Sequence, residues 1–208
     1  MTVDHIHWLG HATFRIDDGA AVIYIDPWKL SAGAPKADVV LITHAHFDHY
    51  SAEDIARIEK PTTVFVAPAD VASKLTGKHV TTATPGGSYL AGTVKVTAVE
   101  AYNTNKDFHP KANGWVGYVV TLSNGQRIYH TGDSDVTPEM QAVQTDVALM
   151  PCGGTYTMTA GEAAAAANVF KPGVLIPMHW GDIVGSRGDA DAVAKAFAGE
   201  TVIRPVKR

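Results

Sequence analysis

Residues 44–49 read His44-Ala45-His46-Phe47-Asp48-His49, and this hexapeptide carries more information about the protein than any other segment. Four of its side chains bind transition metals, because imidazole suits zinc, iron, nickel and copper, and carboxylate suits harder ions. A solvated histidine-rich turn is the alternative interpretation. Four ligand-type residues in six positions, directly after a buried strand, favour a metal site that holds two ions in unlike coordination spheres.

The hexapeptide is predicted to lie on a turn between a strand and a helix. Residues 38–43 form an apolar, β-branched run that is typical of a buried strand. Ser51, followed three residues later by Asp54, predicts a helix that begins near residue 52. Ligands commonly bind at the carboxyl ends of strands in open α/β sheets, so this turn is well placed to contribute to a site.

Short strands and helices are predicted along the whole chain. Residues 37–42 are echoed by residues 145–150, and each run is followed by a turn and a helix, which suggests two related halves packed as an αββα sandwich. Residues 88–131 are expected to form a mostly antiparallel meander. The predicted strands are 5–9, 13–16, 22–25, 38–43, 63–67, 79–83, 88–90, 93–100, 115–122, 127–131, 146–150, 174–178 and 201–204, and the predicted helices are 52–59, 69–76, 138–144, 160–170 and 189–198.

Composition narrows the class of protein. The 208 residues are 46% hydrophobic, enough for the core of one domain, and the net charge is −4. No basic run stands out, so we do not expect a nucleic-acid partner. Cys152 is the single cysteine, and no stretch is apolar enough for a leader or a membrane span. We therefore expect a cytoplasmic protein without a membrane partner, in which a homo-oligomer is possible.

The hexapeptide after a hydrophobic strand resembles the signature of the metallo-β-lactamase fold superfamily. Further blocks resemble its small cytosolic hydrolase branch, which includes ascorbate-phosphate lactonase-type proteins. The resemblance implies a single domain over residues 1–208 with a four-layer αββα sandwich. The blocks that carry it are residues 8–14, 25–27, 129–133, 151–158 and 176–179.

The resemblance also implies a ligand set for two ions. His44 and His46 would bind the first metal, whereas Asp48, His49 and His179 would bind the second. Asp133 would bridge the two. In support, Asp133 and His179 each follow a predicted strand, 127–131 and 174–178.

The last ligand of the first metal is open at this stage. The family usually places a histidine after the strand that ends here near Glu100, but this chain has Asn103 at that point and offers His109 a few residues later. We predict that His109 completes the site, because imidazole is a better ligand than a carboxamide for these ions. Asn103 or an empty position is the alternative.

Several other residues are predicted near the site. His11 and His130 are expected to support the ligands, with a satisfied core histidine as the alternative for both. Gly153 and Gly154 are expected to allow close backbone approach and to offer amide groups to an anionic substrate, unless they are ordinary turn glycines. Trp28, Phe47, Tyr156 and Trp180 could line a pocket or belong to the core, and Cys152 is expected to be a small buried side chain.

These features predict a metal-dependent hydrolase with a small-molecule substrate. Hydroxide held by two divalent ions would cleave a small anionic ester, lactone or phosphoester, with Asp48 and Asp133 as catalytic residues. Zinc is the expected ion, and Mn or Fe is also compatible with the carboxylate ligands. A nucleic-acid phosphodiesterase or nuclease and a non-catalytic metal-binding protein are the alternatives. No Gly-x-Ser-x-Gly or Walker motif occurs.

Overall fold

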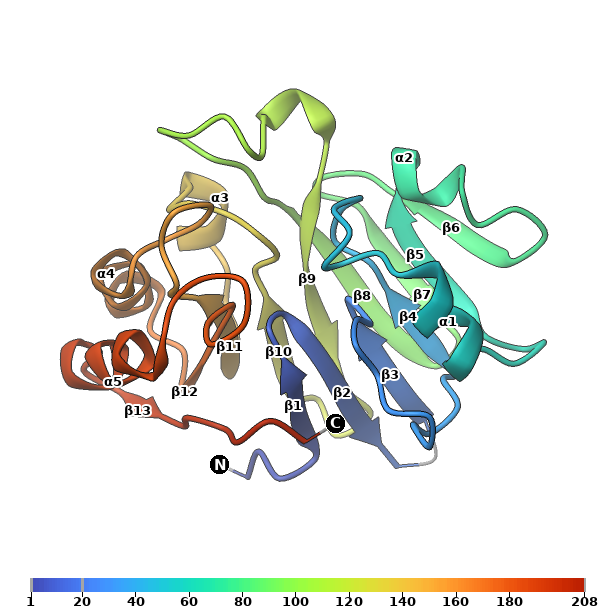
Figure 1. Ribbon diagram of the computed structural model, residues 1–208, viewed down its shortest axis with the longest axis horizontal. Helices are drawn as coiled ribbons and strands as arrows, with labels where there is room; N and C mark the ends of the chain where they lie inside the picture. The colour runs from blue at the N-terminus through green and yellow to red at the C-terminus, as the bar shows by residue number, and fades with distance from the viewer. Residues whose placement is uncertain (1, 20, 208) are drawn as a thin grey trace.

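Two β-sheets packed face to face form the centre of the protein (Figure 1). The computed structural model describes residues 2–19 and 21–207. The first sheet, in spatial order, contains β1 (Ile6–Gly10), β2 (Thr13–Asp18), β3 (Ala21–Ile25), β4 (Val39–Leu41), β5 (Val64–Pro68) and β6 (His79–Ala83). The second contains β13 (Glu200–Thr201), β12 (Val174–Met178), β11 (Val147–Pro151), β10 (Arg127–His130), β9 (Val116–Thr121), β8 (Val94–Glu100) and β7 (Ser88–Ala91).

Helices cover the outer face of each sheet, which confirms the four-layer αββα sandwich (Figure 1). The helices α1 (Ala52–Ile58) and α2 (Ala69–Ala72) pack on the first sheet through a small apolar cluster. The helices α3 (Pro138–Gln141), α4 (Ala160–Phe170) and α5 (Arg187–Ala196) lie beside the second sheet. A larger apolar cluster fills the space between the sheets. In the described part of the chain, every helix is too short or too polar to cross a membrane.

The strand directions place several turns at one edge of the sandwich. Strands β1, β2 and β3 pair antiparallel, whereas β3 to β6 run parallel. The second sheet repeats this arrangement, because β7 to β10 pair antiparallel and β10 to β13 run parallel. The echoed runs, β4 and β11, therefore occupy similar positions within parallel segments of the two sheets. Within each sheet, the turns after the parallel strands emerge on the same side.

Three of the predicted helix starts are confirmed by their hydrogen bonds, whereas the helix expected over 189–198 begins at Arg187 and ends at Ala196. The Ser51 side chain accepts from the Asp54 N–H at 3.2 Å, and the Thr137 side chain accepts from the Met140 N–H at 3.1 Å. At the start of α4, Thr159 and Glu162 form the reciprocal bonds of a capping box. Each bond satisfies an N–H group that has no partner within its own helix.

Some elements are shorter in the structure than predicted. The helix expected over 69–76 ends at Ala72, because Lys74 and Leu75 donate to Val71 O and Ala72 O, three residues back, and so tighten the chain into turns. The strand expected over 201–204 is reduced to β13. A short 3-10 helix, Lys111–Asn113, lies in the loop between β8 and β9 and was not predicted.

Two substitutions in the first turn of α4 test the role of its cap. Thr159→Ala is expected to lower the free energy of unfolding by about 1 kcal/mol, because the Glu162 N–H loses its acceptor. Gly161→Ala is expected to raise it by up to about 1 kcal/mol, because a Cβ at Gly161 meets open space. Urea denaturation measures both, and shifts of the same sign would contradict this account.

Candidate metal centre

Turns at one edge of the sandwich bring the seven predicted ligands together. The hexapeptide follows β4, Asp133 follows β10, and His179 follows β12. His109 comes from the long loop between β8 and β9, which crosses the top of the view in Figure 1. Each side chain except His46 is buried. The two sheets therefore align the turns, and the turns carry the side chains that can bind metal.

The first group consists of His44, His46 and His109. One ring nitrogen from each lies within 4.8 Å of the other two. His44 Nε2 and His46 Nδ1 are 3.1 Å apart. Two nitrogens bound to one tetrahedral zinc ion lie about 3.3 Å apart, because each bond is about 2.0–2.1 Å long. The spacing of this group therefore suits one ion.

The second group consists of His11, Asp48, His49 and His179, again with one ligand atom from each within 4.8 Å of the others. Asp48 Oδ2 is 3.6 Å from His49 Nε2 and 4.0 Å from His179 Nε2. His11 Nε2 lies closer, at 2.8 Å from the same oxygen, and so makes a hydrogen bond to it. Burial raises the pKa of the Asp48 carboxyl, but His11 and His49 outweigh this effect and lower it to about 2.

Asp133 lies between the two groups. Its Oδ2 atom is 3.1 Å from His179 Nε2 and 3.4 Å from His49 Nε2 in the second group. The same atom is 3.3 Å from His109 Nε2 and 3.9 Å from His44 Nε2 in the first. Burial alone would raise the Asp133 pKa, but the facing histidines hold it well below its usual value. The carboxylate is therefore ionised at neutral pH and positioned to be shared by two ions.

Unpaired polar atoms show that these residues fit bound metal. Within residues 2–19 and 21–207, the buried atoms His49 Nε2, His109 Nε2, His179 Nε2 and Asp133 Oδ1 have no hydrogen-bond partner. Leaving a buried polar atom unpaired costs about 1–3 kcal/mol, and native structures contain few such atoms. Four of them converge on one small region, and all are atom types that bind divalent transition metals. A metal pair would satisfy all four.

Asp26, which follows β3, fixes the orientation of two histidines and was missed as a site residue. Its carboxylate accepts from the Thr43 N–H at 2.8 Å, from the Thr43 hydroxyl at 2.6 Å and from His49 Nδ1 at 2.7 Å. Since the Thr43 hydroxyl gives its one proton to Asp26, it accepts from His44 Nδ1 at 2.9 Å. Both rings therefore carry their proton on Nδ1 and turn Nε2 towards the cluster.

Asn103 fixes the orientation of the His109 ring in the same way. The two residues that the sequence analysis named as alternatives therefore act together. Asn103 Oδ1 faces the His109 backbone N–H at 2.9 Å and His109 Nδ1 at 3.0 Å. His109 Nδ1 therefore donates to the amide oxygen and Nε2 points at the cluster. The Asn103 amide also donates to Tyr156 O at 3.0 Å, which ties two loops together. In the sequence, the feature that could have indicated this role was the short spacing between Asn103 and His109.

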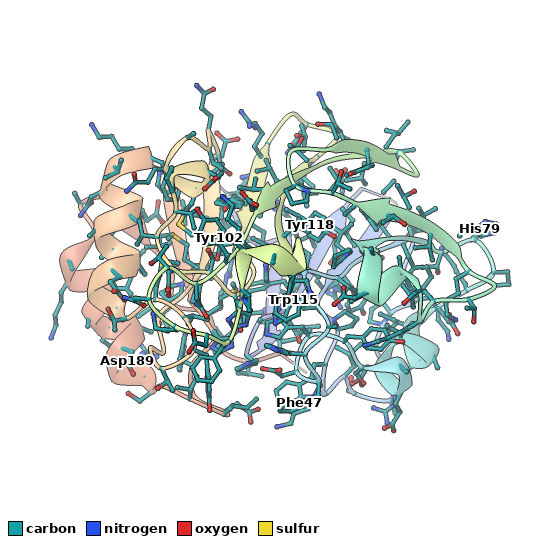
Figure 2. All side chains as sticks on the ribbon, turned by 90° about the horizontal axis from the view of Figure 1, so that it is seen from above. Phe47, His79, Tyr102, Trp115, Tyr118 and Asp189 are labelled. Atoms are coloured by element: carbon teal, nitrogen blue, oxygen red, sulfur yellow. The ribbon has the colours of Figure 1, made fainter. Side chains whose placement is uncertain are left out.

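Trp115 packs against the first group and was not predicted to do so. Its ring centroid is 4.9 Å from those of His44 and His46 and 5.7 Å from that of His109. The indole N–H donates to Asp70 Oδ2 at 2.8 Å, which holds the ring in place. Figure 2 shows Trp115 near the middle of the molecule, with Phe47 at its edge.

Three of the site residues adopt the left-handed backbone conformation, which is uncommon outside glycine. The φ angles of His11, Asp26 and His179 are 50°, 49° and 58°. A hydrogen bond joins two of them, because the His179 N–H donates to His11 O at 2.8 Å. Such conformations cost about 1–3 kcal/mol each and persist where the surroundings determine them. Their concentration here is consistent with a functional site.

For His130 and Trp180 the structure supports the alternative interpretation, a place in the core. Both ring nitrogens of His130 have backbone partners, Ala12 O at 2.9 Å and the Gly132 N–H at 3.1 Å, so it is a satisfied core histidine. Trp180 belongs to the core, where its ring packs against that of Trp8 with centroids 4.7 Å apart and an interplanar angle of 35°. It gives its indole N–H to a backbone oxygen.

The two glycines after β11 differ in role. Gly153 approaches the backbone closely, as predicted, because a Cβ there would collide with His179 O. The Gly154 N–H is not available to a substrate, because it donates to Met158 O at 3.0 Å. Cys152, just before them, is a small buried side chain as predicted, and burial raises its pKa to about 12.

A pocket of about 220 Å³ opens onto the cluster. The predicted aromatic residues Phe47 and Tyr156 line it, whereas Phe108 and Ile183 were not foreseen. Its full lining is His46, Phe47, Asp48, Phe108, His109, Asp133, Tyr156, His179 and Ile183. The volume lies below the roughly 300–1,000 Å³ typical of sites for drug-sized ligands, so the pocket suits a small group.

An αββα sandwich with histidines and aspartates gathered at one edge defines a metal-binding protein of the metallo-β-lactamase fold. Comparison with known proteins agrees: residues 5–179 match the model of the beta-lactamase superfamily domain. A metal-dependent hydrolase of Thermococcus onnurineus is 36% identical over 191 residues, which cover 84% of both chains. One from Anaeromyxobacter dehalogenans is 30% identical and covers 96% of this chain and 82% of the relative. The chain therefore belongs to the beta-lactamase superfamily, within its family of metal-dependent hydrolases.

Solved structures agree with this assignment. A crystal structure from Parabacteroides distasonis is 31% identical, with a TM-score of 0.85, and covers 97% of this chain and 93% of that one. Igni18, a metallo hydrolase from the archaeon Ignicoccus hospitalis, is 26% identical, with a TM-score of 0.79, over 98% of this chain and 95% of its own.

Two variants separate ligand binding from ligand orientation. His109→Ala is expected to lower the metal content by one ion per chain, because the first group loses a nitrogen. Asn103→Ala should keep the stoichiometry and weaken affinity by roughly 10- to 100-fold, since only the orientation of His109 is lost. Elemental analysis and competition with a chelating dye measure the two effects. Unchanged metal content in His109→Ala would reject this residue as a ligand.

Gly153→Ala tests the close approach behind His179. The added methyl group must displace His179 O, so we expect a loss of about 1–3 kcal/mol in the free energy of unfolding. We also expect weaker metal binding, because His179 moves. Gly33→Ala is the matched control, since a Cβ there meets nothing within 4 Å. Equal behaviour of the two variants would contradict the prediction.

Proposed function

We propose that this metal-dependent hydrolase uses two divalent cations to cleave an ester, lactone or phosphoester of a small molecule. His44, His46 and His109 would hold the first cation, and Asp48, His49 and His179 the second. Asp133 would bridge them. The observation that carries the proposal is the convergence of unpaired, buried ligand atoms around Asp133 Oδ2. Zinc is our first choice, because most of these ligands are imidazoles, with Mn or Fe as alternatives.

Bound divalent ions supply Lewis acidity and lower the pKa of water from 15.7 towards about 7. The residues of the chain set up this chemistry. Asp26, Thr43 and Asn103 orient the imidazoles through the hydrogen bonds described above. Asp48, with a pKa of about 2, stays ionised at neutral pH and is suited to orient an attacking water rather than to keep its proton. The hydrogen bond from His11 holds this carboxylate in place.

A role in the cytoplasm and a place in the ascorbate-phosphate lactonase-like branch stay predictions from the sequence. Nucleic acid is not our proposed substrate, because the net charge of −4 provides no general attraction for phosphate chains. A possible homo-oligomer also stays a prediction.

Metal removal tests the proposal. The protein dialysed against a chelator is expected to lose hydrolysis across a panel of esters, lactones and phosphoesters. Activity should return with two equivalents of zinc, manganese or ferrous ion per chain. Asp133→Asn should reduce kcat/KM by more than the roughly 10- to 100-fold that follows the loss of a supporting contact, because the shared anion is lost. Failure of every ion to restore turnover would reject the proposal.

A further inference from the structure

The mouth of the candidate metal centre is lined by apolar side chains that face solvent. Of the six large apolar side chains that are exposed in the described residues, three line this pocket: Phe47 (69% exposed), Phe108 (47%) and Ile183 (40%). Figure 2 shows Phe47 at the edge of the molecule. Gathered apolar side chains at the surface commonly mark a binding site, because covering them removes apolar area from water.

The same pocket offers no positive side chain to a substrate. Among the residues that the structure describes, its lining contains no Lys or Arg, and its charged members Asp48 and Asp133 are acidic. Lysines on nearby loops are already paired, Lys29 with Asp182 at 2.7 Å and Lys106 with Asp135 at 2.6 Å. A carboxylate or phosphate on the part of the substrate that lies away from the metals would therefore find no counter-charge.

Phe108 and Tyr156 form an aromatic wall of the pocket, and their mutual contact holds this wall in a fixed arrangement. The rings of Phe108 and Tyr156 meet edge to face, with centroids 4.8 Å apart and an interplanar angle of 82°. The Tyr156 backbone is fixed by hydrogen bonds from its N–H to Gly154 O at 2.7 Å and from the Asn103 amide to its carbonyl. A ring that is positioned before the substrate arrives loses less entropy on binding.

We infer that the substrate is an uncharged ester or lactone that carries an aromatic or compact aliphatic group beside the scissile bond. This inference rests on the proposed hydrolase function. The aromatic or aliphatic group packs against Phe47, Phe108 and Tyr156. In the reaction, the oxygen of water bonds to the carbonyl carbon, the bond from that carbon to the leaving oxygen breaks, and a proton passes to the leaving oxygen. The products are one carboxylic acid and one alcohol, or one hydroxy acid from a lactone. The inference replaces the anionic substrate expected from the sequence.

Matched substrates test this preference on the metal-loaded protein. One series is γ-phenyl-γ-butyrolactone, γ-butyrolactone and γ-carboxy-γ-butyrolactone, and the other is methyl 3-phenylpropanoate, methyl propanoate and monomethyl succinate. We expect kcat/KM to be highest for the phenyl member, by roughly tenfold or more over the unsubstituted one, and lowest for the carboxylate. Phenyl phosphate is included as a phosphoester.

The outcomes separate the inference from the proposed function. If a carboxylate substrate or phenyl phosphate has the highest kcat/KM, the hydrolase assignment stands and the inference is overturned. Turnover of none of the compounds with zinc, manganese or ferrous ion would overturn both.

Binding provides a readout that does not depend on turnover. The lactam 5-phenylpyrrolidin-2-one should bind the metal-loaded protein more tightly than 5-oxopyrrolidine-2-carboxylate in calorimetry. Phe108→Ala should remove this difference and lower kcat/KM for the phenyl lactone by roughly tenfold, with a smaller reduction for γ-butyrolactone and an unchanged metal content. Leu90→Ala is the matched control, because Leu90 is 72% exposed but does not line the pocket. Equal effects of the two variants would overturn the inference.

Discussion

The buried carboxylate of Asp26 is the constraint on which the rest of the site depends. It lies at the end of β3 with no exposure to solvent, and a buried charge is tolerated only where donors surround it. Thr43 and His49 supply those donors, and both belong to the turn after β4. The hydrogen bonds therefore join two neighbouring strands and at the same time turn two imidazoles towards the second sheet.

The second sheet contributes Asp133 and His179, which follow β10 and β12. The site is thus complete only when the two sheets are packed against each other, so metal affinity and sheet packing are coupled. An ion that binds the folded chain and not the unfolded chain stabilises the fold by mass action. The unpaired nitrogens and the left-handed residues cost stability without metal, and ligation is the interaction that offsets this cost.

Much of this arrangement could be predicted from the sequence. The apolar runs in residues 38–43 and 145–150 predicted the central strands, and Ser51, Thr137 and Thr159 predicted three helix starts, because these signals are local. Asp26 could not be recognised as a supporting residue, since its partner His49 is 23 residues away and the contact forms only when β3 pairs with β4. For the same reason the sequence could not decide between a site role and a core role for Trp180 and His130. Their neighbours in sequence belong to the site, but their side chains point into the core.

Asn103 links the two properties that an enzyme of this kind must have. One end of its amide sets the proton position on His109, and the other end holds the backbone of Tyr156, which forms the wall of the pocket. A carboxylate at this position would lose the donor to Tyr156 O. A neutral histidine, with its single acceptor nitrogen, could accept only one of the two His109 N–H groups that Asn103 Oδ1 accepts. A change at Asn103 would therefore alter metal affinity and pocket shape together, whereas changes at Phe47, Phe108 or Ile183 can alter the pocket without removing this contact.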